Sequence, residues 1–395
     1  MSFRVLATCS ETAARVGVLE TPHGPLHTPA FMPVGTQASV KGLDPHELRA
    51  VGAECLLANT YHLALRPGEA LIQQLGGLHR FMGWDGPLLT DSGGFQVWSL
   101  APLREVTADG VAFRSHLDGR PLLFTPEGVI AIQQALGADI IMPLDVCLEY
   151  PATEPEAAAA LETTYQWLQR ALAAHRDGVQ QLFGIVQGAT YPELRQQAAR
   201  VLAALDLPGY AIGGLSVGEP KDVMEAMLAT TVPELPTDRP RYLMGVGAPD
   251  DLLMAVEHGV DMFDCTLPTR MGRAGSLLTR RGRLNLRNAR FRREAGPAVP
   301  DCDCAVCTRY PAATLHWLFQ EGHALGGRLA SYHNLYFLCQ LLREARAAIA
   351  AGHFPAFRAA FSRDWVASDP AVGREQRRRW RTVQSQRWPA PVAER

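Results

Sequence analysis

Three aspartates each follow directly on a short apolar run of the kind that forms a buried β-strand, namely Asp91, Asp145 and Asp264. A single aspartate in such a place more often caps a helix or a turn. Three of them can instead meet at one edge of a sheet. A carboxylate pair supports chemistry at an acetal-like carbon, because one carboxylate attacks the carbon while the other transfers protons. These residues therefore predict cleavage of a glycosidic or N-glycosidic bond.

Polar and small residues after other apolar runs indicate what is bound. Gln187 follows the fifth run, and the pair Gly213-Gly214 ends the sixth. A carboxylate such as Asp145 accepts from N1–H and N2–H₂ of guanine, while the amide of Gln187 donates to O6. Glycines let the backbone approach a planar ligand edge-on, and the ring of Phe95 or Tyr61 can stack on it. The set favours a guanine-like base over a sugar.

A cysteine cluster with the spacing Cys302-x-Cys304-x₂-Cys307 is the only close group among the eight cysteines. In a cytosolic protein such a cluster indicates a metal site rather than disulfides. A closed tetrahedral zinc site needs a fourth ligand, and the nearby histidines are His316, His323 and His333. We favour His333, because it precedes an apolar helix, predicted at 335–351, that can pack back on the cysteine loop. A Cys₃His set leaves no open coordination position, so the predicted zinc is structural.

The stretch 265–293 carries nine arginines and no Asp or Glu, although the net charge of the whole chain is only −2. Arginine grips phosphate through a planar fork, so this stretch predicts a surface for a nucleic-acid backbone. The alternative is a solvated face in a protein whose cations are nearly all arginine. The residues predicted to contact RNA are Arg270, Arg273, Arg283, Arg287 and Arg290.

The elements that must position these side chains are short apolar runs alternating with amphipathic segments, and the alternation repeats eight times. This pattern is typical of parallel βα units, and eight units favour a closed (β/α)₈ TIM-type barrel of the α/β class. The predicted strands are 31–35, 55–59, 88–90, 140–144, 182–187, 210–213, 242–246 and 260–263. The clearest predicted helices are 154–175 and 192–205, with shorter ones at 45–51, 127–136, 221–231 and 249–258. In this fold the active site lies at the C-terminal ends of the strands, where the polar residues above are found.

Three segments do not fit the alternation. Residues 1–28 are predicted to form an antiparallel lead-in, 97–125 an antiparallel excursion after the third strand, and 265–333 a basic, zinc-binding insertion after the eighth strand. The barrel with its insertions is predicted to span 29–364, followed by a basic and partly disordered tail, 365–395. The chain has no apolar run of about 18 residues and no signal-peptide pattern at its start. We therefore expect a cytoplasmic protein with no membrane partner.

Several motifs, all in the same order, resemble those of tRNA-guanine transglycosylases, and the resemblance covers residues from about 3 to about 364. The motifs are Thr90-Asp91-Ser92-Gly93-Gly94-Phe95-Gln96, Gly213-Gly214-Leu215-Ser216-Val217-Gly218-Glu219, Phe263-Asp264-Cys265 with Pro268-Thr269-Arg270, and the three cysteines with His333-Asn334-Leu335. The resemblance implies that Asp264 is the nucleophile at the ribose C1′ and that Asp91 is the general acid and base. The base-binding residues it implies are Asp145, Gln187, Gly214, Leu215, Ser92, Cys147 and Phe95. It also implies zinc on Cys302, Cys304, Cys307 and His333, and a homodimer that acts on one tRNA at a time.

Bacterial members of that family are similar to this chain in Cys147 and Val217. The resemblance to them implies that this protein exchanges guanine at the wobble position of tRNAs with a GUN anticodon for 7-aminomethyl-7-deazaguanine, in queuosine biosynthesis. The chain departs from their pattern at Val146, where Glu is usual, at Met271, where Asn is usual, and in its tail beyond about residue 370.

Two other classes of protein share part of this pattern. A non-catalytic RNA-binding relative would lack the acid and the nucleophile, whereas Asp91 and Asp264 are both present. A retaining glycoside hydrolase also uses two carboxylates on a barrel of this kind. Such a hydrolase needs neither the arginine stretch nor the cysteine cluster.

Overall fold

The computed structural model describes residues 2–100, 104–176, 178 and 180–366, and its centre is a parallel sheet. In spatial order the strands are β11 (Gln181–Leu182), β10 (Ile140–Ile141), β6 (Leu88–Asp91), β5 (Leu56–Asn59), β4 (Ala30–Gly35), β15 (Met262–Cys265), β14 (Arg241–Leu243), β13 (Tyr210–Ile212) and β12 (Gly184–Val186). Only Phe183 separates β11 from β12, so the first and last members are two halves of one strand. The sheet therefore closes on itself, which confirms the predicted (β/α)₈ barrel and all eight predicted strands.

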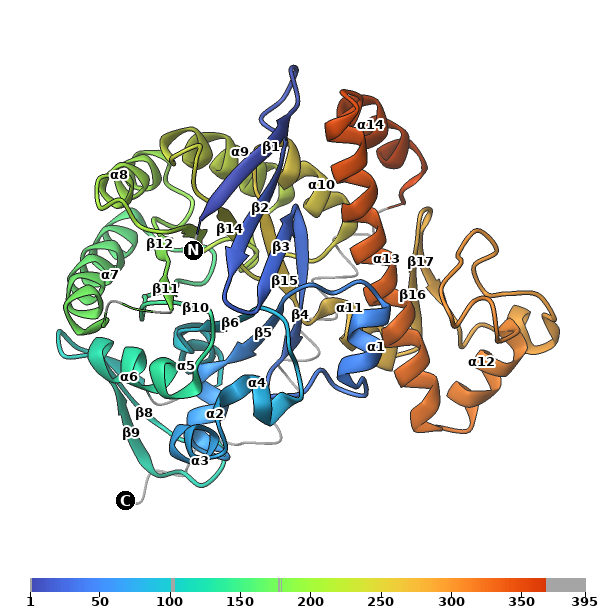
Figure 1. Ribbon diagram of the computed structural model, residues 1–395, viewed down its shortest axis with the longest axis horizontal. Helices are drawn as coiled ribbons and strands as arrows, with labels where there is room; N and C mark the ends of the chain where they lie inside the picture. Colours follow the sequence, from blue (N-terminus) through green and yellow to red (C-terminus); the bar gives the residue numbers. More distant parts are fainter. Residues whose placement is uncertain (1, 101–103, 177, 179, 367–395) are drawn as a thin grey trace.

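Helices surround the closed sheet (Figure 1). The six predicted helices are all present, as α1 (Pro45–Ala50), α6 (Pro126–Leu136), α7 (Glu154–Ala174), α8 (Pro192–Ala203), α9 (Lys221–Thr231) and α10 (Pro249–Glu257). The longest of them, α7, starts with a capping box between Thr153 and Glu156, which satisfies backbone donors of its first turn. It buries an apolar stripe that includes Leu161, Trp167 and Leu168, so its periodicity is visible in the sequence.

The segment between β5 and β6 holds three helices that the apolar pattern did not predict, α2 (Thr60–Leu65), α3 (Glu69–Gln74) and α4 (Gly77–Met82). Each has six residues, which is too short for a 3.6-residue period to be recognised.

The prediction of a helix at 335–351 was wrong at its start, because α13 (Ala324–Ala350) begins before the cluster histidine. His333 therefore lies inside the helix and not ahead of it. Gly326 and Gly327 make the first turns look unlike a helix, but they allow close packing. A Cβ at Gly326 would lie 3.1 Å from Cβ of Leu318 in α12 (Ala312–Gln320).

The lead-in consists of three antiparallel strands, β1 (Phe3–Thr8), β2 (Arg15–Thr21) and β3 (Gly24–Thr28), and β3 leads almost directly into β4. Leu19 and Leu26 are fully buried in one cluster with the inward-facing residues of the barrel strands. The small sheet thus covers the N-terminal end of the barrel, and Figure 1 shows it in front of the barrel strands. The C-terminal end remains for the site.

Two further units extend from the barrel. Strands β7 (Arg104–Val106), β8 (Val111–Arg114) and β9 (Pro121–Phe124) form an antiparallel sheet between α5 (Gly94–Leu100) and α6. After β15, the chain forms α11 (Leu267–Arg273), the hairpin β16 (Ser276–Thr279) and β17 (Gly282–Asn285), η2 (Ala289–Arg293) and α12. We call residues 275–323 the lobe.

The remaining elements are η1 (Val232–Glu234) and α14 (Phe354–Asp364), which packs against α10 and α13. The predicted basic tail, 365–395, lies outside the described residues except for Trp365 and Val366. Within the described part of the chain, no helix combines the length and the apolar character needed to cross a membrane.

Candidate active site and metal centre

Asp91 ends β6 at the C-terminal mouth of the barrel. The end of the neighbouring strand β5 and the start of α2 supply one donor to each of its carboxylate oxygens. Asn59, the last residue of β5, donates from Nδ2 to Oδ2 over 2.5 Å, and the backbone N–H of Thr60 donates to Oδ1 over 3.1 Å. Burial nevertheless raises the pKa of Asp91 to about 7, and the negative charge of Asp264 adds to the rise. A carboxyl group with this pKa can give up and take back a proton at neutral pH.

Asp264 lies in β15 and faces the same mouth. The hydroxyl of Tyr242, from β14, donates to its Oδ1 over 2.6 Å, and the backbone N–H of Gly245 donates to the same oxygen over 2.8 Å. Among the described residues no donor contacts Oδ2, so this is the oxygen that can attack a ligand. Burial raises the pKa of Asp264 above its ordinary value, whereas the two donors oppose that rise.

The third carboxylate, Asp145, is buried just after β10 and held between two side chains. Ser92 donates from Oγ to Oδ1 over 3.1 Å, and Gln187 donates from Nε2 to Oδ2 over 2.7 Å. Burial raises the pKa of Asp145. Each carboxylate oxygen has two acceptor sites, so Asp145 retains capacity for the N–H groups of a ligand. The structure thus brings Ser92, Asp145 and Gln187 together, as the base-binding prediction requires.

Glycines bring the backbone close to this group. Gly214 has a φ of +66°, and a Cβ there would lie 2.4 Å from Oε1 of Gln187, so only glycine fits. Burial raises the pKa of the nearby Cys147 thiol to about 12, and the backbone of Gly214 opposes that rise. Cys147 is therefore a buried, neutral thiol near Asp145 and not a nucleophile. Leu215 is buried directly after the glycines.

Phe95 differs from these groups, because its side chain on α5 is 51% exposed. An exposed ring beside the buried Ser92 and Gly94 is available to stack on a planar ligand.

The two departures at Val146 and Met271 are both buried. Val146 packs with Leu144 and Trp167 in an apolar cluster that also contains buried residues of β8 and β9. Its backbone N–H donates to Oγ1 of Thr164 over 3.1 Å. Its side chain therefore belongs to an apolar cluster, whereas that of Asp145 takes part in the polar group. Met271 lies in the core that α11 forms with α13.

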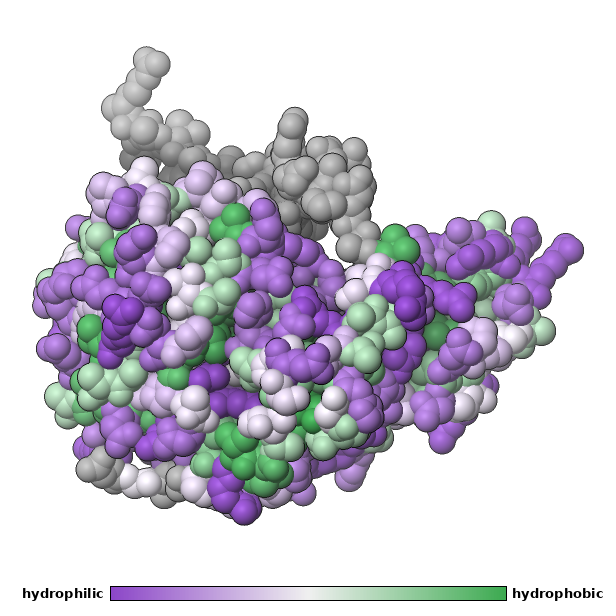
Figure 2. Space-filling view, turned by 90° about the horizontal axis from the view of Figure 1, so that it is seen from above, coloured by the Kyte–Doolittle hydropathy of each residue, from purple (hydrophilic) through white to green (hydrophobic). Residues whose placement is uncertain are grey.

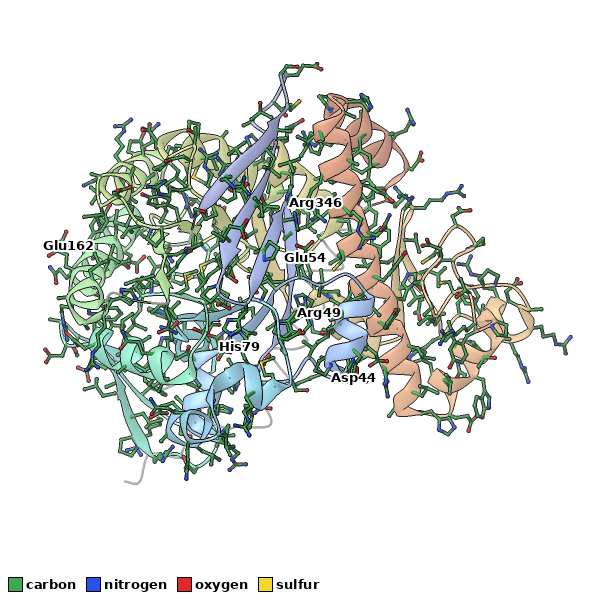
Figure 3. The ribbon with its side chains drawn as sticks, in the orientation of Figure 1. Asp44, Arg49, Glu54, His79, Glu162 and Arg346 are labelled. Carbon is green, nitrogen blue, oxygen red and sulfur yellow. The ribbon has the colours of Figure 1, made fainter. Side chains whose placement is uncertain are left out.

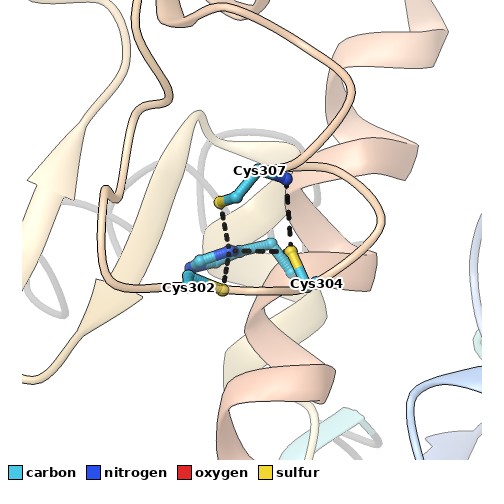
Figure 4. A group of neighbouring side chains, drawn as sticks. Cys302, Cys304 and Cys307 are labelled. Atoms are coloured by element: carbon cyan, nitrogen blue, oxygen red, sulfur yellow. Dashed lines mark hydrogen bonds between the residues drawn. The ribbon is translucent and has the colours of Figure 1, made fainter.

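The three cysteines surround the imidazole of a single histidine, and Figure 4 shows their arrangement. Nδ1 of His333 lies 3.7, 3.5 and 3.4 Å from the Sγ atoms of Cys302, Cys304 and Cys307. Sulfur and nitrogen atoms bound to one tetrahedral zinc at about 2.3 and 2.1 Å are about 3.6 Å apart. The distances and the donor set therefore fit a metal ion of this kind.

The other ring nitrogen of His333 is also engaged, since Nε2 lies 2.8 Å from the carbonyl oxygen of Leu278 in β16. An Nε2–H donated to this carbonyl leaves Nδ1 with its lone pair toward the sulfurs, which is the usual outer support of a metal-bound histidine. The competing histidines have other roles. His316 contacts the carbonyl oxygen of Leu286 over 2.8 Å, and the ring of His323 packs against Trp317.

All nine arginines of 265–293 are exposed, on α11, on the β16–β17 hairpin, on η2 and, for Arg287, in the short link between β17 and η2. Figure 2 shows that hydrophilic residues cover much of the lobe, which projects from the barrel. Of these arginines only Arg280 takes part in a described ion pair, with Glu344. Arg287 has a structural role as well, because it donates from Nη1 to the carbonyl oxygen of Phe319 over 2.9 Å. Arg270 and Arg273 lie on α11, directly after Asp264.

Sequence reasoning did not identify the residues that hold the two carboxylates. Asn59 ends a barrel strand, so the rule that selected Asp91 could have selected it as well. Tyr242 lies within a strand, where nothing in the sequence distinguishes a core tyrosine from one that contacts Asp264. Arg195, in α8, was also missed, because nothing in the sequence distinguishes it from the exposed arginines of a helix. It is fully buried, and it donates to the carbonyl oxygens of Ala189 and Gly213 over 2.7 Å, which fixes the glycine loop.

A closed parallel barrel with a polar C-terminal mouth and a Cys₃His cluster beside it defines a TIM-barrel enzyme with a lobe that carries a candidate metal site. The sequence profile of the family described as queuine tRNA-ribosyltransferase matches residues 9–367. A queuine tRNA-ribosyltransferase from Pelotomaculum thermopropionicum is 54% identical over 365 residues, which cover 92% of this chain and 99% of the relative. Proteins of the same name from Geobacillus kaustophilus and Dehalococcoides mccartyi are 52% and 51% identical over 91% and 96% of this chain, and over 95% and 97% of their own lengths. The chain belongs to the queuine tRNA-ribosyltransferase family.

Proposed function

We propose that this protein is a tRNA-guanine transglycosylase of queuosine biosynthesis. It exchanges guanine at the wobble position of tRNAs with a GUN anticodon for 7-aminomethyl-7-deazaguanine. The observation that supports this most is the pair of carboxyl groups at one mouth. Asp91 has a pKa of about 7, and Asp264 presents one oxygen without a donor among the described residues.

Each carboxyl group then has one task. Oδ2 of Asp264 forms a bond to the ribose C1′ while the C1′–N9 bond of guanine breaks, and the departing base takes the proton of Asp91. The resulting Asp91 carboxylate accepts a proton from the incoming deazaguanine, whose N9 attacks C1′ and releases Asp264. The donors on Oδ1 of Asp264, from Tyr242 and Gly245, stabilise the released carboxylate.

Recognition of the base rests on the polar group around Asp145. Asp145 accepts from the N1–H and N2–H₂ edge that guanine and its deaza analogue share, and Gln187 donates to O6. The backbone at Gly214 and Leu215, the neutral thiol of Cys147 and the hydroxyl of Ser92 complete the pocket wall. Phe95 stacks on the ring, and its 51% exposed side chain is available for this role.

The ion held by Cys302, Cys304, Cys307 and His333 is zinc in this proposal, and its role is structural. The four ligands occupy all tetrahedral positions, so no position remains for a reacting water. We further propose that the protein acts as a homodimer on one tRNA at a time, as its resemblance to tRNA-guanine transglycosylases implies.

Incubation of the protein with radiolabelled guanine and tRNA tests the proposed function. Label must enter the RNA, and unlabelled 7-aminomethyl-7-deazaguanine must compete with it. A non-catalytic RNA-binding relative would bind tRNA without incorporating label, and a glycoside hydrolase would do neither. Either result would contradict the proposal.

The pH dependence of kcat/KM follows from the two carboxyl groups. Asp91 must carry its proton to expel guanine, so activity is expected to fall as pH rises through about 7, the pKa of that group. Asp264 must be ionised, and its pKa is raised, so activity also falls at acid pH, above the range of an ordinary aspartate. Initial rates of guanine incorporation between pH 4.5 and 9 would show this bell shape.

A matched variant tests whether Asp91 causes the fall of kcat/KM at alkaline pH, the alkaline limb of the pH profile. Asn59→Ser keeps an acceptor for the N–H of His62 but removes the amide that donates to Asp91, so the limb should move to higher pH. His62 cannot produce this limb, because burial lowers its pKa to about 4. An alkaline limb unchanged in Asn59→Ser would contradict the assignment to Asp91.

Salt dependence tests the arginine surface. Each lost phosphate contact should reduce the slope of log K against log salt by about 0.7 to 0.9. We expect Arg283→Ala with Arg290→Ala to weaken tRNA binding and flatten this slope, and adding Arg287→Ala to flatten it further at some cost in stability. Arg4→Ala, at the opposite end of the barrel, is the control and should leave both unchanged. Unchanged affinity and slope in the triple variant would move the RNA site to another surface.

A further inference from the structure

A second cluster of metal-binding side chains lies at the N-terminal end of the barrel. It consists of His23, in the turn between β2 and β3, His79, in α4, and Asp139, which directly precedes β10. The backbone N–H of Leu88 donates to Oδ2 of Asp139 over 2.8 Å. Leu88 begins β6 whereas Asp91 ends it, so the cluster is about 10 Å along the strand from the carboxyl groups at the mouth.

The three side chains offer one ligand atom each, and these atoms lie within 4.8 Å of one another. Nδ1 of His23 lies 2.7 Å from Oδ1 of Asp139, and Nε2 of His79 lies 3.3 Å from Oδ2. That Nε2 atom is buried and makes no hydrogen bond among the described residues. Its contact with Oδ2 of Asp139 is an ion pair that does not reach hydrogen-bond geometry, and a metal ion between the two atoms would satisfy both of them. Figure 3 labels His79, which is part of α4, beside the barrel strands.

We propose that His23, His79 and Asp139 bind a first-row divalent transition-metal ion such as Zn²⁺, Co²⁺ or Ni²⁺. Two imidazoles and one carboxylate suit these ions, whereas Mg²⁺ and Ca²⁺ prefer ligand sets made only of oxygen. The N–H of Leu88 orients the carboxylate, in the manner of the groups that support metal ligands. Three protein ligands leave a coordination position for solvent, so this site exchanges its ion, unlike the closed Cys₃His centre.

Metal binding requires one movement. The rings of His23 and His79 are stacked, with centroids 3.5 Å apart and planes at 19°. An ion lies close to the plane of each imidazole that binds it, so the two rings must tilt apart. His23 is the ring that can move, because it is 38% exposed on a hairpin turn, whereas His79 is 13% exposed on a helix. The bound ion joins the lead-in sheet to the barrel, since its ligands come from both.

The test is a titration of the full-length, zinc-loaded protein with Co²⁺, followed by visible absorption. Because zinc already fills the Cys₃His centre, we expect one further equivalent of Co²⁺ whose d–d bands appear without a thiolate-to-cobalt charge-transfer band. His23→Ala and His79→Ala should each weaken this binding by at least tenfold. Co²⁺ should also raise the Tm of the wild type and not that of His23→Ala.

His27→Ala is the matched control. His27 lies on the same small sheet and also pairs with a carboxylate, with Nδ1 2.8 Å from Oε2 of Glu54, but it belongs to no metal cluster in the described part of the chain. It should bind Co²⁺ like the wild type. His23 is on an exposed turn, so His23→Ala should remain folded and incorporate guanine normally. Absence of the further equivalent, or Co²⁺ binding by His23→Ala and His79→Ala as tight as that of His27→Ala and the wild type, would show that the cluster holds only protons and would overturn the proposal.

Discussion

Asp264→Asn is expected to form no covalent adduct with tRNA and to lower guanine exchange by about 10⁴- to 10⁶-fold, as removal of a nucleophile does in other enzymes. A neutral amide oxygen is a poor nucleophile. The substitution keeps Oδ1, to which Tyr242 and Gly245 donate, so the fold should persist. The measurement is a denaturing gel of the variant with tRNA and a slow second base, which traps the adduct of the wild type as a shifted band.

Asp91→Asn is the companion variant, and it should behave differently. It keeps the nucleophile but has no proton to give, so a little adduct can form while exchange falls by about 10²- to 10⁴-fold. Asp251→Asn is the matched control. Asp251 also has a raised pKa, of about 6 and caused mainly by burial, but it pairs with Lys221 on the outside of the barrel. A persistent band in Asp264→Asn and none in Asp91→Asn would reverse the two roles.

Removal of the zinc ion proposed for the lobe is the second change with a large expected effect. Chelation, or Cys304→Ser, should lower the free energy of unfolding by about several kcal/mol, because binding free energy is folding free energy at such a site. The lobe should unfold locally while the barrel remains, so tRNA affinity falls with it. Elemental analysis, thermal unfolding and tRNA binding before and after chelation measure these effects.

Cys9→Ser is the control for this experiment, because Cys9 is a buried cysteine outside the cluster. It should retain the metal and tRNA binding. A metal-free protein with wild-type stability and full activity would contradict the structural role. A rate that followed the identity of the bound metal would instead indicate that the ion takes part in the chemistry.

Much of the fold could be predicted because its signals are local. A barrel strand buried on both faces is a short apolar run, so all eight strands could be predicted, and a long helix that packs on them shows a 3.6-residue period, so six of the surrounding helices could be predicted as well. The short helices α2, α3 and α4 could not be predicted, since six residues carry no period. The start of α13 was missed because Gly326 and Gly327 disfavour a helix locally, while packing against α11 and α12 favours it.

By itself, the sequence determined which chemical groups are available and at which end of the barrel they stand. Parallel strands end together, so Asp91, Asp145 and Asp264 had to share one mouth once eight βα units were recognised. Only the tertiary structure decided their properties. The pKa of Asp91 depends on burial and on Asp264 and Asn59, which come from other strands. The choice of His333 as fourth ligand, and the meeting of His23 with His79 and Asp139, likewise depend on distances between atoms far apart in the chain, and packing alone sets those distances.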